Sequence, residues 1–121
     1  MHKPIQILLI EDDPVWQEAI KALLSSTVQF ELAAIAEDMD SALLAYQRKT
    51  PEIILLDWQI LGEKDGIEVG KILLSQGVPS EHIVLISGAN PSSIPKHPFL
   101  YVPKPLIATD LLPLLASVTQ R

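Results

Sequence analysis

Residues 53–57 read Ile-Ile-Leu-Leu-Asp, four aliphatic side chains followed directly by a carboxylate. A continuous aliphatic run of this length is typical of a strand that is covered on both faces, as in a parallel sheet. Further short runs rich in Ile, Val and Leu occur at residues 5–10, 30–35, 83–86 and 99–102. The sequence therefore predicts five short strands, and most of them are expected to be buried.

Stretches with helical spacing of apolar residues separate these runs. In the first stretch, Trp16, Ile20, Leu23 and Leu24 recur at the spacing of one helix face. Helices are predicted over residues 15–26, 39–49, 66–76 and 109–119. Alternating strands and helices with short connections are typical of a doubly wound α/β sheet.

Prolines and capping residues indicate several boundaries. Pro14 suits the first turn of the first helix, and Asp38 is a candidate N-cap for the second. Pro113 favours a start of the last helix at Thr109 or one residue earlier, because proline is best tolerated near a helix N-terminus. Three prolines lie within residues 91–98, so we expect a loop or a single turn there.

The composition excludes several classes of protein. The chain has 121 residues, the size of one domain, and its 48% hydrophobic and 20% charged residues exclude a disordered tail. Without cysteine it has no disulfide scaffold or thiolate metal site. It shows no membrane-spanning run and no signal-peptide pattern, and its net charge of −6 argues against direct binding of nucleic acid. We expect a soluble, cytoplasmic protein without a membrane partner.

Reactive side chains follow four of the predicted strands, at the edge where doubly wound sheets bind their ligands. They are Glu11, Asp12 and Asp13 after the first strand, Asp57 after the third, Ser87 after the fourth and Lys104 after the fifth. Converging carboxylates repel one another unless a cation is present, and Mg²⁺ suits such ligands. An aspartate can accept a phosphoryl group while a hydroxyl and a lysine hold its oxygens. The set predicts Mg²⁺-dependent phosphoryl transfer to an aspartate.

Five motifs stand in order along the chain: Leu9-Ile10-Glu11-Asp12-Asp13, Ile54-Leu55-Leu56-Asp57, Asp65-Gly66, Val84-Leu85-Ile86-Ser87-Gly88-Ala89 and Tyr101-Val102-Pro103-Lys104-Pro105. Together they resemble the receiver domains of two-component response regulators, of the kind found in chemotaxis regulators. The resemblance covers the whole chain and implies one receiver domain over residues 1–121. It also implies a five-stranded, flavodoxin-like (βα)₅ sheet in the order 2-1-3-4-5, here with the fourth helix shortened or absent.

The resemblance implies a metal site. Glu11 and Asp12 match the acidic pair that holds Mg²⁺, with Asp12 as the direct ligand. Asp57 matches a further metal ligand, and Gln59 matches the position whose backbone carbonyl completes the site.

The resemblance also implies a phosphorylation site. Asp57 matches the residue that accepts the phosphoryl group, Ser87 the hydroxyl that moves toward this group, and Lys104 its lysine partner. Tyr101 matches the aromatic switch position. A sensor histidine kinase or a histidine phosphotransfer protein is the expected donor, and another, unknown protein is the expected downstream partner. Such a chain promotes its own phosphorylation and dephosphorylation without being a conventional enzyme.

Two segments depart from the family pattern. Residues 57–65 contain one extra residue, and Leu61 stands where proline is usual. The interval from Ser87 to Lys104 is several residues short. These departures keep an alternative open, in which the fold serves as a protein-interaction module that does not depend on phosphorylation. A hydrolase of the haloacid-dehalogenase type fits poorly, since Gln59 replaces the second aspartate that it needs. A flavodoxin also fits poorly, because the acidic residues 11–13 would repel a phosphate.

The last predicted helix leaves its own question open. Its leucine-rich face is broader than one core stripe requires, which is consistent either with an ordinary core helix or with an interface such as that of a homodimer. The face consists of Leu111, Leu112, Leu114, Leu115 and Val118. No output domain follows residue 121, so the expected effector is a separate protein or a part of the chain not included in this sequence.

Overall fold

Five parallel strands form a single sheet in a computed structural model that describes residues 3–119. The strand order is β2-β1-β3-β4-β5, as the resemblance implied. The strands are β1 (Ile5–Ile10), β2 (Phe30–Ala36), β3 (Ile53–Asp57), β4 (Ile83–Ser87) and β5 (Leu100–Pro103). The predicted doubly wound fold is therefore confirmed, whereas residues 1–2 and 120–121 of the predicted domain lie outside the described residues.

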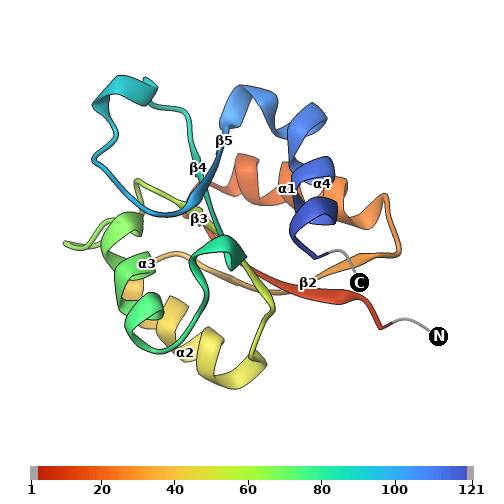
Figure 1. Cartoon of the computed structure of the whole chain (residues 1–121), viewed down its shortest axis with the longest axis horizontal. Helices are drawn as coiled ribbons and strands as arrows, with labels where there is room; N and C mark the ends of the chain where they lie inside the picture. The colour runs from red at the N-terminus through yellow and green to blue at the C-terminus, as the bar shows by residue number, and fades with distance from the viewer. Residues whose placement is uncertain (1–2, 120–121) are drawn as a thin grey trace.

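Helices cover both faces of this sheet (Figure 1). The helix α1 (Pro14–Ser25) and the final helix α4 (Ile107–Val118) lie on one face, and α2 (Met39–Lys49) and α3 (Gly66–Ser75) lie on the other. Across residues 3–119, none of the helices combines the length and the hydropathy that a bilayer-spanning segment requires.

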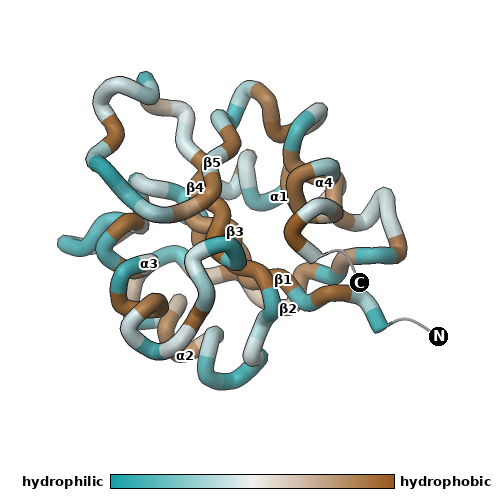
Figure 2. Tube along the Cα trace, in the orientation of Figure 1, coloured by the Kyte–Doolittle hydropathy of each residue, from teal (hydrophilic) through white to brown (hydrophobic). Residues whose placement is uncertain are grey.

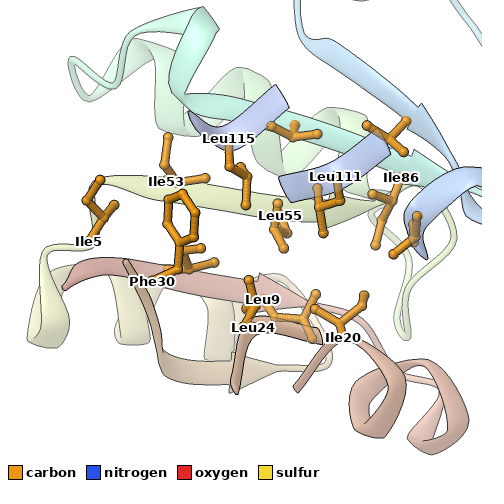
Figure 3. Packing of buried hydrophobic residues seen from close by; sticks show 14 residues of the cluster. Ile5, Leu9, Ile20, Leu24, Phe30, Ile53, Leu55, Ile86, Leu111 and Leu115 are labelled. Atoms are coloured by element: carbon orange, nitrogen blue, oxygen red, sulfur yellow. The ribbon is translucent and has the colours of Figure 1, made fainter. Parts of the chain in front are cut away.

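The central strands are apolar on both sides because each face of the sheet carries its own core. Along β3, Ile53 and Leu55 face α1 and α4, while Ile54 and Leu56 face α2 and α3. Figure 3 shows the first of these cores, where Leu24 of α1 and Leu111 of α4 meet the strands. The hydropathy of the chain follows the same arrangement, with the most apolar segments at the centre (Figure 2). Side chains that alternate between two cores explain the unbroken aliphatic runs.

Most predicted boundaries agree with the structure to within one residue. Pro14 is the first residue of α1, and the Asp38 side chain caps α2 through the Ser41 N–H. The boundary predicted from Pro113 is wrong, since α4 begins at Ile107 and continues through this proline. The exposed Pro113 sacrifices one backbone hydrogen bond, while the buried Leu111 and Leu115 anchor the helix on either side. Three half-buried residues of the leucine-rich face also pack against this core, as in an ordinary core helix: Leu112, Leu114 and Val118.

The expected loss of a helix between β4 and β5 is confirmed. This interval contains only the short 3₁₀ turn Pro91–Ser93, and the rest is an open loop that stands out from the sheet in Figure 1. Residues at its end cover the sheet instead of a helix, with Ile94, Phe99 and Tyr101 packed on the core beneath α3. We call residues 88–98 the β4–β5 loop.

The lengthened segment between β3 and α3 is held by a neighbouring loop. The N–H of Leu61 donates to the carbonyl of Glu37 over 3.1 Å, and Leu61 forms an isolated parallel bridge with Asp38. Gly62 follows with a φ of 94°, a left-handed conformation that favours glycine. The chain then returns to α3 at Gly66, whose N–H donates to the Trp58 carbonyl over 2.7 Å. The extra residue is thus accommodated beside the sheet without displacing the start of α3.

Candidate functional site

Three carboxylates meet at the carboxyl ends of β1 and β3, as predicted. Glu11, Asp12 and Asp57 each offer an oxygen, and these oxygens lie within 4.8 Å of one another. Glu11 and Asp57 are buried, with 0% and 4% of their surface exposed, whereas Asp12 is half-buried. Charges this close and this poorly hydrated repel one another, so the site favours a cation.

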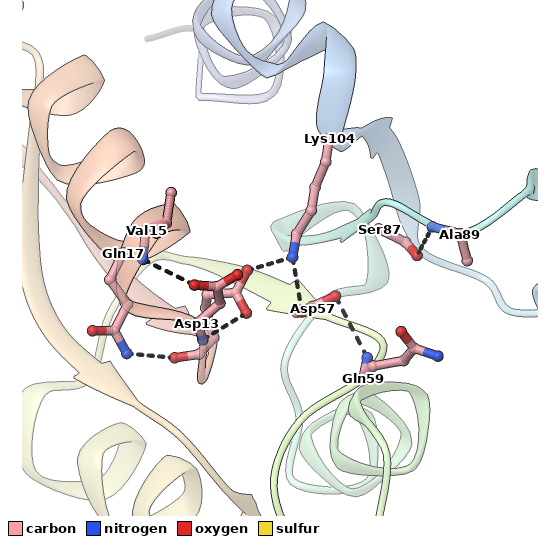
Figure 4. A network of polar contacts seen from close by, with 9 residues as sticks. Asp13, Val15, Gln17, Asp57, Gln59, Ser87, Ala89 and Lys104 are labelled. Atoms are coloured by element: carbon pink, nitrogen blue, oxygen red, sulfur yellow. Dashed lines mark hydrogen bonds and ion pairs between the residues drawn. The ribbon is translucent and has the colours of Figure 1, made fainter.

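The acidic triplet after β1 divides into different roles. Asp13 turns away from the cluster and caps α1, with its Oδ1 accepting a hydrogen bond from the Val15 N–H over 2.9 Å. The Gln17 side chain fixes the preceding backbone by donating to the Glu11 carbonyl over 2.7 Å. These contacts, drawn in Figure 4, leave Glu11 and Asp12 to form the cluster.

Lys104 lies across the two buried carboxylates (Figure 4). Its Nζ is 2.6 Å from Glu11 Oε1 and 3.1 Å from Asp57 Oδ2. Burial lowers the pKa of Lys104, but the hydrogen bonds and charges of Glu11 and Asp57 outweigh it and raise the pKa overall. Lys104 therefore stays charged and neutralises part of the cluster. It stands between Pro103 and Pro105, whose rings restrict the backbone that carries it.

Glu11 has the most perturbed environment of these acids. Burial, aided by the adjacent Asp57, raises its pKa from 4.5 to about 6, although Lys104 acts in the opposite direction. Its Oε1 is buried and has the ammonium of Lys104 as an ion-pair partner, but makes no hydrogen bond of good geometry. A further cation near this oxygen would complete its coordination.

Ser87 ends β4 beside the cluster and is buried, with 2% of its surface exposed. Its Oγ accepts a hydrogen bond from the Ala89 N–H over 3.0 Å, which is the first contact of the β4–β5 loop (Figure 4). This bond does not use the hydrogen of the hydroxyl, so Ser87 can still donate one hydrogen bond.

The remaining predicted residues lie further from the centre. The N–H of Gln59 faces Asp57 Oδ1 over 3.4 Å, while the Gln59 side chain is exposed. Tyr101 is half-buried on β5, and its hydroxyl is buried without a hydrogen-bond partner. The role of Gln59 in metal binding and that of Tyr101 as a switch stay predictions.

The donor set fits a hard divalent cation. Carboxylate oxygens are the ligands that Mg²⁺ prefers, and the half-buried Asp12 leaves one side of the cluster open to its waters. Glu11, Asp12 and Asp57 are the residues that would hold the ion.

Trp16 is a neighbour of the site that sequence analysis assigned only to the apolar face of α1. The ammonium of Lys104 lies over its ring, 5.2 Å from the ring centroid. One signal in the sequence could have indicated this position. Trp16 follows closely on Pro14, the first helical residue, and so belongs to the first turn of the helix that follows the acidic triplet.

Comparisons with known proteins agree on one family. The model of the response regulator receiver domain matches residues 7–112. The transcriptional regulatory protein MalR from Bacillus subtilis is 33% identical over 97 residues, which cover 80% of this chain and 40% of MalR. The chain spans less than half the length of the curated relatives it matches.

Solved structures share the fold at low sequence identity. The signal receiver domain of the putative response regulator NarL from Mycobacterium tuberculosis has a TM-score of 0.83 at 21% identity, covering 99% of this chain and 100% of that one. CheY in the CheX–CheY–BeF₃–Mg²⁺ complex from Borrelia burgdorferi also has a TM-score of 0.83, at 19% identity, with 98% and 91% covered.

Proposed function

The chain belongs to the response regulator receiver domain family, and we propose from this that Asp57 accepts a phosphoryl group in a two-component phosphorelay. The observation that carries the proposal is the convergence of Glu11, Asp12 and Asp57 with the ammonium of Lys104. Carboxylates and a lysine at one edge of a sheet are the parts that phosphoryl transfer to an aspartate requires.

In this proposal a phosphohistidine on a sensor kinase or a phosphotransfer protein is the donor. A carboxylate oxygen of Asp57 attacks the phosphorus, the phosphorus–nitrogen bond of the donor breaks, and its electron pair stays on the imidazole, which takes up a proton. The product on this chain is an acyl phosphate. Mg²⁺, when bound, supplies charge stabilisation for the phosphoryl oxygens. The CheY domain of similar fold, solved as a complex with BeF₃ and Mg²⁺, supports this choice of ion.

The other residues of the site stabilise the transferred group. The ammonium of Lys104, 3.1 Å from Asp57 Oδ2, is placed to pair with a phosphoryl oxygen. The Ser87 hydroxyl retains a hydrogen that it can donate to another such oxygen. The chain thereby assists its own phosphorylation and later hydrolysis, but it converts no separate substrate in repeated turnovers as a conventional enzyme does.

The output of the phosphorylated domain is proposed to be a changed surface that another protein recognises. The added phosphoryl charge would draw Ser87 inward and act on the β4–β5 loop that begins at Gly88.

One observation favours a second function, that of an interaction module independent of phosphorylation. The Ser87 hydroxyl is already bound within its own turn to Ala89, and no helix follows that could relay a movement. In this alternative the β4–β5 loop presents a fixed surface.

Mass spectrometry of the intact protein distinguishes the two. After incubation with Mg²⁺ and acetyl phosphate or phosphoramidate, we expect one added phosphoryl group on the wild type and on Asp40→Asn, which changes an exposed aspartate of α2. Asp57→Asn should gain none. A wild type that stays unmodified under conditions in which Mg²⁺ binds would favour the interaction module.

A further inference from the structure

The ammonium of Lys104 has three neighbours that come from three different elements. Two are anions, Glu11 after β1 and Asp57 at the end of β3, at 2.6 and 3.1 Å. The third is the indole of Trp16 in α1, whose centroid lies 5.2 Å from Nζ. Only 10% of the Lys104 side chain is exposed, so these neighbours replace most of the water around its charge.

The two anions are also the groups that a metal ion would engage. Oxygens of Glu11 and Asp57 belong to the same cluster as Asp12. A divalent ion held there competes with the ammonium for these oxygens and repels it. The indole is not contested in this way, since Mg²⁺ prefers oxygen ligands, whereas an aromatic face attracts an ammonium through its quadrupole.

The indole is also held firmly. Asp13 caps α1 and Pro14 begins it, which fixes the first turn in which Trp16 stands. The Trp16 side chain packs against the core between α1, α4 and the sheet. A ring fixed in this way costs little conformational entropy when it binds a flexible lysine.

We propose that Trp16 is a positioning residue that keeps the Lys104 ammonium at the site while Glu11 and Asp57 turn their oxygens to a metal ion. This inference rests on the proposed function, because it assigns a task to Trp16 in the same reaction. Its consequence is that the cation–π contact grows in importance when metal binds, so that removing the ring weakens metal binding.

The first test measures Mg²⁺ affinity by NMR, following the amide of Gln59, which does not depend on the number of tryptophans. Trp16→Leu keeps an apolar side chain and should weaken Mg²⁺ binding about 3- to 30-fold, the range that a cation–π contact corresponds to. Trp16→Phe keeps an aromatic face and should recover most of this loss. In a Lys104→Met background the same Trp16→Leu change should have no effect. A loss of the same size with and without Lys104 would overturn the proposal.

The second test reads the contact directly. Protons on the Lys104 carbon next to Nζ should resonate upfield of ordinary lysines because of the indole ring current, and they should stay upfield when Mg²⁺ saturates the site. The Lys104→Met variant assigns the signal, and Trp16→Leu should remove the upfield shift. A return of the signal to the ordinary lysine position on addition of Mg²⁺ would show that the ammonium leaves the ring, and the proposal would fail.

Phosphorylation by acetyl phosphate separates this inference from the function on which it rests. We expect Trp16→Leu to be phosphorylated several-fold more slowly than the wild type, with Trp16→Phe in between. A wild type without phosphorylation contradicts the proposed function. A phosphorylated wild type whose rate and Mg²⁺ affinity equal those of Trp16→Leu contradicts only the role of Trp16.

Discussion

The ring of Phe99 fills the space that a side chain at Gly70 would need. A Cβ atom placed on Gly70 of α3 would lie 2.5 Å from Cζ of Phe99, and 3.0 Å from Cδ2 of Leu56. Phe99 is itself buried, with 7% of its surface exposed. Because no helix lies between β4 and β5, this ring at the end of the β4–β5 loop covers the sheet next to α3. A glycine in the middle of α3 makes that close approach feasible.

The first prediction follows from this fit. Alanine in place of a glycine inside a helix normally stabilises it by roughly 0.5–1 kcal/mol. At Gly70 we expect the opposite sign, a loss of about 1–2 kcal/mol, because a new methyl group would overpack the core against Phe99 and Leu56. Urea denaturation of Gly70→Ala measures it.

A double variant provides the control for this prediction. In a Phe99→Leu background the methyl group has more room, so Gly70→Ala should be neutral or stabilising there. If Gly70→Ala stabilises the protein even with Phe99 present, the ring does not pack as described.

The second prediction concerns pH. Burial raises the pKa of Glu11 from 4.5 to about 6, so the folded protein holds this proton more tightly than the unfolded chain. As the pH rises from 4.5 to about 6, the contribution of Glu11 to the free energy of unfolding should fall, on the order of 1–2 kcal/mol, and then level off. The stabilisation is therefore present at low pH and lost toward neutral pH.

The measurement compares the wild type with Glu11→Gln in chelator, by urea denaturation across this pH range. The stability of the wild type relative to Glu11→Gln should decrease as the pH rises. A relative stability that increases instead would show that Lys104, at 2.6 Å, stabilises the charged carboxylate more than burial destabilises it.

The third prediction concerns metal and the repulsion within the cluster. Among the described residues, the Asp12 side chain makes no ion pair or hydrogen bond, whereas Glu11 and Asp57 share Lys104. In chelator, Asp12→Ala should therefore raise the free energy of unfolding by roughly 1 kcal/mol, because it removes one repelling charge. Asp57→Ala should gain less, since it also breaks an ion pair with Lys104.

Addition of Mg²⁺ should reverse the order of wild type and Asp12→Ala. At a concentration ten times its Kd, binding stabilises the wild type by about 1.4 kcal/mol, and Asp12→Ala should show little of this gain. Thermal unfolding with and without Mg²⁺ is the measurement, and the fluorescence of Trp58, next to Asp57, reports binding independently. Equal stabilisation of both proteins by Mg²⁺ would place the ion elsewhere.

The sequence predicted those features of the fold that local pattern determines. Each aliphatic run became a strand, because residues such as Ile54 and Leu55 must each find a core on opposite faces of the sheet. The convergence of Asp12 and Asp57 followed from the topology alone, since the carboxyl ends of neighbouring parallel strands share one edge.

Contacts between distant segments could not be predicted in the same way. The fit of Phe99 on Gly70 and the position of Trp16 under Lys104 depend on packing between elements that are far apart in the chain. Pro113 was misjudged for a related reason, because the burial of Leu111 and Leu115 outweighs a local preference against proline in a helix.

The last prediction concerns how phosphorylation reaches the surface. The β4–β5 loop has few internal backbone hydrogen bonds, those of its single 3₁₀ turn, and a shallow cavity of about 350 Å³ lies between it and Tyr101. Its end is fixed more firmly, since His97 Nδ1 accepts from the Phe99 N–H over 3.1 Å and the two rings stack. Such a segment has low local stability, so a nearby charge can order it.

The connection between the site and this loop is the hydrogen bond from the Ala89 N–H to Ser87 Oγ. When Ser87 turns toward a phosphoryl group on Asp57, this bond must change, and the loop from Gly88 to His97 must rearrange with it. We expect the phosphoryl mimic beryllofluoride, with Mg²⁺, to slow amide hydrogen exchange mainly in residues 88–97. Ser87→Ala should bind the mimic but lose most of this protection, because it lacks the hydroxyl that connects the two. Protection confined to the loops that carry Asp12 and Asp57, with residues 88–97 unchanged, would exclude the switch and leave a fixed surface as the output.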